Sequence, residues 1–132
     1  KGSENYEILP IQPWESVKKV ETGHPEIVNE EQWTIVQIKN SKDLLKEGRG
    51  LNHCVYSYHS QVVGGRTAIF SLRYKEIKFF VCTEEKPLIT IELNRNMRSI
   101  VQARGTGNRA MTYKERELVR EWADLNGFRI TC

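Results

Sequence analysis

Two segments of this chain carry closely spaced residue types that do acid–base, nucleophilic or ligand-binding chemistry. The first, residues 48–58, contains His53 and Cys54 shortly after two glycines. The second, residues 90–109, contains Glu92 and, further on, a Gln-x-Arg pattern that leads into a glycine-rich loop. A histidine acts as acid, base or phosphate contact near neutral pH, and a cysteine thiolate is a nucleophile. The sequence therefore predicts a functional surface built from these two segments.

The reactivity expected of Cys54 depends on its place at the start of a helix. Residues 53–63 are predicted to form that helix, because Val55, Tyr58 and Val62 form one apolar stripe. A helix N-terminus carries a partial positive charge, which lowers the pKa of a thiol placed there. The same pattern also fits a buried cysteine, a histidine that hydrogen-bonds the loop, and a core Tyr58.

Strand alternation decides which residues of the second segment share a face. Thr90 and Glu92 lie on the face opposite their apolar neighbours, and Gln102 and Arg104 are neighbours on one surface. A planar cation and an amide beside a glycine loop suit an anionic or polar ligand. The alternative for Glu92 is an exposed cross-strand pair with Arg98.

The turn between these two strands decides whether Glu92 joins the Gln102 surface. A loop formed by residues 94–96 would pair Glu92 with Arg98 and leave Glu92 and Gln102 on one face. A loop with an even number of residues would place them on opposite faces. We expect the odd-length loop and one shared surface.

The ordered set of these motifs resembles the PcfJ-like family. The resemblance rests on Leu-Leu-Lys-Glu-Gly and Leu-Asn-His-Cys-Val within 44–55, Thr-Ile-Glu at 90–92, and Gln-Ala-Arg-Gly-Thr-Gly-Asn at 102–108. It implies a bacterial protein of conjugative plasmids, prophages or related mobile elements, and it implies nothing for residues 1–32. The polar positions that it carries over are His53, Cys54, Tyr58, Arg73, Thr90, Glu92, Gln102, Arg104 and Asn108.

The remaining pattern predicts an α+β fold. Strands are expected at residues 33–38, 67–74, 77–83, 88–93 and 99–104, which are alternating or rich in β-branched residues. Besides the helix at 53–63, a short helix capped by Ser41 should end at Gly48 and Gly50, and a helix capped by Thr112 should end at Gly127. Strands joined by short turns run antiparallel. We therefore expect an antiparallel meander of about four to five strands, with three flanking helices mainly on one face.

The domain organisation follows from the distribution of proline and apolar residues. Residues 1–32 contain three prolines and few apolar residues, which predicts a loosely structured N-terminal arm. Residues 33–132 then form a single PcfJ-like domain, and the chain reads as a domain of a longer protein.

The composition narrows the class of protein. The chain has 132 residues, of which 39% are hydrophobic and 28% charged, and no apolar run approaches the roughly 20 residues of a membrane-spanning helix. A net charge of +3 permits contact with phosphates without requiring it. Three cysteines without a Cys-x-x-Cys pair favour reduced thiols in a bacterial cytoplasm, and the sequence identifies no metal site or cofactor.

Three functions remain open from the sequence. One is a domain of a mobile-element protein that binds or processes nucleic acid through a polar cleft. A second is an enzyme on another substrate, in which Cys54 or His53 acts with Glu92. The third is a non-catalytic interaction module, with other domains of the full-length protein or other mobile-element proteins as partners.

Overall fold

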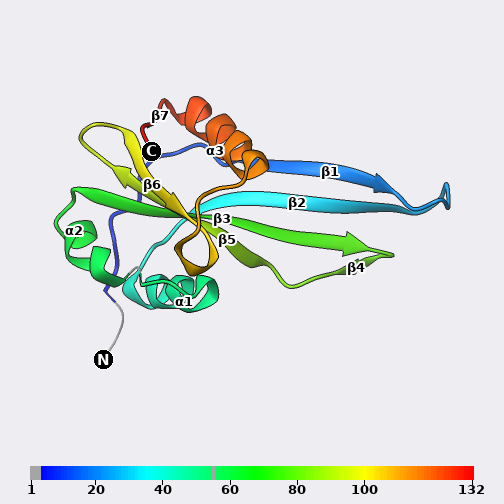
Figure 1. Ribbon diagram of the computed structural model, residues 1–132, viewed down its shortest axis with the longest axis horizontal. Helices are drawn as coiled ribbons and strands as arrows, with labels where there is room; N and C mark the ends of the chain where they lie inside the picture. The colour runs from blue at the N-terminus through cyan, green and yellow to red at the C-terminus, as the bar shows by residue number, and fades with distance from the viewer. Residues whose placement is uncertain (1–3, 55) are drawn as a thin grey trace.

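The computed structural model describes residues 4–54 and 56–132, and it has an α+β architecture built on one curled, mixed sheet (Figure 1). The strand order is β1-β2-β3-β5-β6-β7, with β4 paired to β3. All the pairs are antiparallel except β6 with β7. The strands are β1 (Glu15–Glu21), β2 (Val28–Gln37), β3 (Thr67–Lys78), β4 (Val81–Cys82), β5 (Lys86–Asn94), β6 (Ser99–Arg104) and β7 (Arg129–Ile130). The α+β prediction is confirmed, with more strands than expected.

Helices cover both faces of the sheet (Figure 1). The α-helices are α1 (Ser41–Leu51), α2 (His59–Val63) and α3 (Tyr113–Asn126), and the single 3-10 turns are η1 (Tyr56–Tyr58) and η2 (Thr106–Asn108). Two of the three α-helices, α1 and α2, share one face, whereas α3, the longest, packs on the other. The sequence did not indicate this division.

Alternation along β3 creates one core on each face of the sheet. Phe70 belongs to the larger core, where its ring centroid lies 4.8 Å from that of Trp122 on α3. Ile69, the next residue back, faces Leu44 of α1 and Val62 of α2 in the smaller core. Because both faces are buried, the central strands form a rigid layer between the helices.

Helix α3 begins and ends as the sequence predicts. The Thr112 side chain accepts a hydrogen bond from the Glu115 N–H at 3.1 Å, and the Glu115 carboxylate accepts one from the Thr112 N–H at 2.8 Å. Gly127 ends the helix with a φ of 71°. On its core face Trp122 is buried, but Leu125 is 44% exposed.

The predicted ends of α1 are wrong at both termini. The N-cap is Asn40, whose side chain accepts from the Asp43 N–H at 2.8 Å. The helix runs through both glycines to Leu51, because Leu51 is buried and its packing outweighs the roughly 1 kcal/mol cost of each glycine. Gly50 also lies close to β5: a Cβ there would be 3.0 Å from Pro87 Cγ.

The helix predicted at residues 53–63 starts too early, although its end at Val63 is confirmed. His53 and Cys54 lie in a loop after α1, and the α-helical part begins only at His59. Val55, part of the predicted apolar stripe, lies outside the described residues. Cys54 therefore lacks the helix N-terminus on which its predicted activation depends.

The strand predicted at residues 77–83 is divided by a turn. Ile77 continues β3 and pairs with Glu30 of β2, which lengthens β3 beyond its predicted end. Phe79 and Phe80 then form the turn, with φ values of 48° and 69°, and β4 follows as two residues. The outer parts of β1 to β4 extend away from the helices (Figure 1).

The segment 1–32, expected to be loose, contains regular structure. Residues Glu15–Glu21 form β1, and β2 begins at Val28. Trp14 is 9% exposed and belongs to the larger core. Strand pairing with β2 organises this segment although it has few buried apolar residues. The division at residue 32 stays a prediction.

Replacing Thr112 by alanine should lower the free energy of unfolding by about 1 kcal/mol, because the first turn of α3 loses its cap. Urea denaturation followed by circular dichroism measures the change. Thr112→Ser is the matched control, because its hydroxyl retains the capping bond. Equal losses in the two variants would contradict the role assigned to the hydroxyl.

Candidate functional site

Eight of the nine polar residues selected from the sequence line one small cleft. They come from the loop after α1, from η1, from the neighbouring strands β5 and β6, and from η2. The cleft lies on the face of the sheet that α1 covers. Its lining residues are His53, Cys54, Tyr58, Thr90, Glu92, Gln102, Arg104 and Asn108.

The strands bring Glu92 and Gln102 together by a different route from the one predicted. Ser99 pairs with Asn94, so the loop comprises residues 95–98 and has an even length. The odd-length prediction is wrong. A β-bulge at Val101 then shifts the register by one residue, so that Glu92 pairs with Gln102.

The bulge also moves Ile100 to the opposite face. Regular alternation would put Ile100 on the same face as Gln102, but Ile100 is fully buried in the larger core. Val101, the extra residue, is 40% exposed. One inserted residue therefore allows β6 to fill the core and to present Gln102 and Arg104 to the cleft.

Tyr58 connects the two sides of the cleft. Its hydroxyl donates a hydrogen bond to Gln102 Oε1. Burial raises the pKa of Tyr58, and the nearby Glu92 raises it further, while Arg104 acts in the opposite direction. The Tyr58 ring thus packs against the smaller core, while its hydroxyl reaches the polar residues of the cleft.

Glu92 is an acidic group whose ionisation is opposed by its surroundings. Burial raises the pKa of Glu92, and the nearby Tyr58 hydroxyl partly offsets that rise. The carboxyl therefore holds its proton to a higher pH than a fully solvated glutamate does. Its pair with Arg98, considered from the sequence, is not formed, because Glu92 pairs with Gln102.

His53 shifts in the opposite direction. Burial lowers the pKa of His53, which favours the neutral imidazole, and a hydrogen bond with its own backbone partly opposes this. Its Nε2 lies 3.2 Å from Thr90 Oγ1. The cleft thus combines a basic group that loses its proton more readily and an acidic group that keeps its proton more firmly.

Glu47 is a buried carboxyl that lies within the family pattern at residues 44–48 but was not predicted as a site residue. It is 2% exposed and accepts hydrogen bonds from Thr90 Oγ1 at 2.7 Å and from Ser71 Oγ at 2.9 Å. Burial raises the pKa of Glu47, and these two bonds and Arg73 act against the rise. Helical spacing offered a signal, since Glu47 shares the buried stripe of Leu44 and Leu51.

Arg73 is the one selected residue outside the cleft. Its Nε donates to Ser71 Oγ at 3.3 Å, and its Nη1 lies 3.8 Å from Glu85 Oε1. It lines a separate hollow together with Glu47. Arg73 therefore approaches the cleft only through Ser71 and the buried carboxyl.

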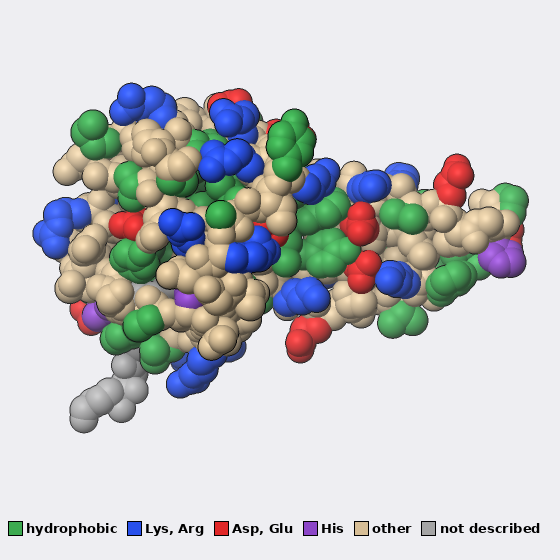
Figure 2. Space-filling model, in the orientation of Figure 1, with side chains coloured by type: hydrophobic (Ala, Val, Ile, Leu, Met, Phe, Trp, Pro, Cys, Tyr) green, Lys and Arg blue, Asp and Glu red, His purple; other side chains and the backbone are tan. Residues whose placement is uncertain are grey.

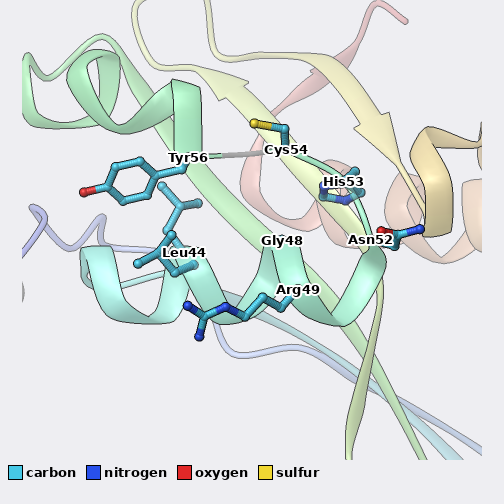
Figure 3. Close-up of a pocket in the computed structure, with 8 residues that line it drawn as sticks. Leu44, Gly48, Arg49, Asn52, His53, Cys54 and Tyr56 are labelled. Carbon is cyan, nitrogen blue, oxygen red and sulfur yellow. The ribbon is translucent and has the colours of Figure 1, made fainter.

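A larger hollow of about 570 Å³ adjoins the cleft and shares His53 and Cys54 with it. Figure 3 shows this hollow beside α1, with Leu44 and Tyr56 on one side and His53 on the other. The Tyr56 ring stacks on His59, with centroids 5.0 Å apart and planes 8° apart. The hollow thus offers apolar and aromatic surface directly beside the acid–base groups.

The arginine side chains around the site differ in how free they are to bind a ligand. Arg109 forms two hydrogen bonds with the Glu115 carboxylate, at 2.8 Å and 2.9 Å, so its guanidinium is engaged at the start of α3. Arg104 projects into the cleft, and Arg49 lines the larger hollow. Figure 2 shows Lys and Arg side chains distributed over the compact part of the molecule.

The described part of the chain comprises residues 4–54 and 56–132. No group of three or more His, Cys, Asp or Glu side chains in these residues is placed to hold a metal ion. Within the same residues, no helix combines the length and apolar character needed to cross a membrane.

Fold and site together define a small α+β domain with a polar acid–base cleft between a helix and the central strands. The model of the PcfJ-like protein family matches residues 11–119, and the chain belongs to this family. The match extends beyond the 44–108 segment that carried the resemblance.

A curated relative is the uncharacterized protein Lin1253/Lin1744 of Listeria innocua, which is 36% identical over 87 residues. The aligned region covers 64% of this chain and 17% of the relative. The chain therefore spans a small part of the length of that protein. No solved structure matches the chain.

Replacing Tyr58 by phenylalanine should raise the pKa of Glu92 further, because the nearby hydroxyl that opposes the rise is lost. NMR titration of the Glu92 side-chain carboxyl measures the shift. Tyr74→Phe is a matched control, since the Tyr74 hydroxyl donates to Glu31 at 2.9 Å, and Glu31 does not line the cleft. An unchanged Glu92 titration in Tyr58→Phe would contradict the contact.

Proposed function

We propose that this domain binds a nucleic acid strand in the cleft and cleaves its phosphodiester backbone by general acid–base catalysis. The observation that carries the proposal is the pairing of His53 and Glu92, whose pKa values shift toward each other in one cleft. Titratable groups with such opposite shifts are typical of acid–base sites. Arg104 beside them supplies a planar cation suited to a phosphate.

Five of the cleft residues have a role in this reaction. His53, favoured as the neutral imidazole, accepts the proton of the attacking hydroxyl as the new P–O bond forms. Glu92, in its protonated form, donates a proton to the leaving oxygen as the old P–O bond breaks. Arg104 binds the non-bridging oxygens, and Gln102, held by Tyr58, positions the strand.

The larger hollow accommodates the nucleobase of the nucleotide next to the reacting phosphate. Its apolar wall includes Leu45, which is 40% exposed, and the Tyr56 ring is held in place by its stack on His59. Stacking of a base on an aromatic ring is worth about 1–3 kcal/mol and tolerates any base. The hollow shares His53 with the cleft, so a nucleobase bound there lies beside His53, the proposed proton acceptor.

The biological setting proposed is a larger bacterial, cytoplasmic protein of a plasmid, prophage or related mobile element. The family resemblance supports the mobile-element setting. The chain covers only a small share of the Listeria relative, which supports the proposal that the domain functions within a longer protein.

Glu92→Gln and His53→Ala should each lower the cleavage rate by about 100-fold or more, the usual contribution of one acid–base group. The assay incubates single-stranded RNA and single-stranded DNA with the protein, with and without added Mg²⁺, and separates the products by length. RNA-only cleavage identifies the 2′-hydroxyl as the attacking group, and cleavage of both identifies water. Glu31→Gln, the same change outside the cleft, should retain the wild-type rate.

Binding measured by fluorescence anisotropy separates catalysis from binding alone. Glu92→Gln should retain affinity, and the affinity should fall steeply as salt increases. Binding without cleavage would refute the catalytic step and favour a binding module. Absence of binding at low salt would refute the proposal as a whole. Loss of cleavage in Cys54→Ser, with His53→Ala active, would instead favour a thiol nucleophile.

A further inference from the structure

A continuous chain of hydrogen bonds runs from His53 into the interior of the protein. His53 Nε2 lies 3.2 Å from Thr90 Oγ1, and the same hydroxyl lies 2.7 Å from Glu47 Oε2. Glu47 Oε1 accepts from Ser71 Oγ at 2.9 Å, and Ser71 Oγ accepts from Arg73 Nε at 3.3 Å. The cleft is thus connected to the hollow that Arg73 lines on the other side of Glu47.

The single proton of the Thr90 hydroxyl constrains this chain. When Thr90 donates to the Glu47 carboxylate, it must accept from His53, so the imidazole carries its proton on Nε2. When Glu47 is protonated and donates to Thr90, the hydroxyl donates to Nε2, and the imidazole carries its proton on Nδ1. Both arrangements satisfy every group in the chain, and they differ by one proton.

We propose that Glu47, Thr90 and His53 form a proton relay, in which Glu47 is a positioning residue that receives the proton His53 takes from the substrate. This inference rests on the proposed function, in which His53 is the general base. It adds the route by which the proton leaves the cleft.

The relay is balanced in protons and charge. The attacking hydroxyl gives its proton to His53 Nδ1, and the Nε2 proton passes to the oxygen of Thr90. The hydroxyl proton of Thr90 passes to Glu47 Oε2. The imidazole is again neutral, and Glu47 has gained one proton.

The surroundings of Glu47 allow the proton to leave on the side of Glu47 that faces away from the cleft. Glu47 lines a hollow of about 300 Å³ with charged side chains, although only 2% of its own surface is exposed. A bound substrate would fill the cleft and leave this hollow open. The charged groups around Glu47 are Asp43, Lys46, Arg73 and Glu85. The titratable or charged groups around His53 are Arg49, Cys54, Tyr56, Tyr58, Glu92 and Arg104.

The protonation state of His53 in the substrate-free protein tests the relay. Two-dimensional ¹⁵N NMR reports both the pKa and the tautomer of each imidazole, and a His53→Gln variant assigns the signal among the three histidines. The wild type should show the neutral ring with its proton on Nε2. Glu47→Gln should lower the pKa of His53, because the carboxylate that favours the imidazolium is removed.

Two substitutions of Thr90 test the hydroxyl directly. Thr90→Val keeps the shape and removes the hydroxyl, so His53 should lose its preference for the Nε2 tautomer and its pKa should fall. Thr90→Ser restores the hydroxyl and should return both properties to the wild-type values. This pair carries the test where Glu47→Gln does not fold, and Glu31→Gln is the control for a charge change outside the cleft.

The outcomes separate the relay from the proposed function. Identical His53 titrations in the wild type, Glu47→Gln and Thr90→Val would overturn the relay, even where the protein cleaves nucleic acid. Coupled titration in a protein that cleaves neither RNA nor DNA would refute the proposed function, and with it the transfer of a substrate proton, and would leave only the coupling of Glu47, Thr90 and His53. In a protein that cleaves, the pH–rate profile of Thr90→Val should follow its altered His53 pKa, and that of Thr90→Ser should match the wild type.

Discussion

The burial of the Glu47 carboxyl between helix α1 and the sheet is the constraint on which the rest of the site depends. A carboxyl removed from water is costly unless hydrogen bonds replace the lost hydration. Ser71 of β3 and Thr90 of β5 provide those bonds, so the helix is fixed against both strands at once. His53 follows α1 after a single residue, and its position is therefore set by the same contacts.

The cleft combines a rigid wall with two short loops. Glu92 and Gln102 lie on paired central strands, whose opposite face is packed against α3. Asn52, just before His53, and Asn108, at the cleft, have positive φ values of 51° and 71°. Asparagine tolerates this left-handed conformation better than most residues do, and it lets both loops turn back toward the sheet.

Much of the fold was predictable from local sequence patterns, because strand alternation and helix capping depend on residues close together in the chain. Strand β6 was predicted at its observed bounds, and the capping box of α3 was read from Thr112 and Glu115. The ends of α1 could not be predicted in this way. The close approach of Gly50 to Pro87 and the burial of Leu51 are tertiary contacts, which the local sequence does not reveal. Local composition likewise did not indicate that pairing with β2 would order β1.

The candidate site was predictable as a set of residues but not as a mechanism. Alternation and the family pattern selected the residues that the cleft brings together. Arg73 was selected from the family pattern, which gives the residue type but not its position along the sheet. Glu47 was missed because its role depends on Ser71 and Thr90, which only the packed structure brings to it.

The bulge at Val101 gives β6 one residue more than its two faces need. Ile100 and Ala103 occupy core positions, and Gln102 and Arg104 occupy cleft positions, which regular alternation would achieve with one fewer residue. Strand β6 can therefore lose one residue at this position and keep its pairing with β5. A single-residue deletion at Val101 would close the ladder without exchanging core and cleft, whereas in a regular strand the same loss would turn every following side chain to the wrong face.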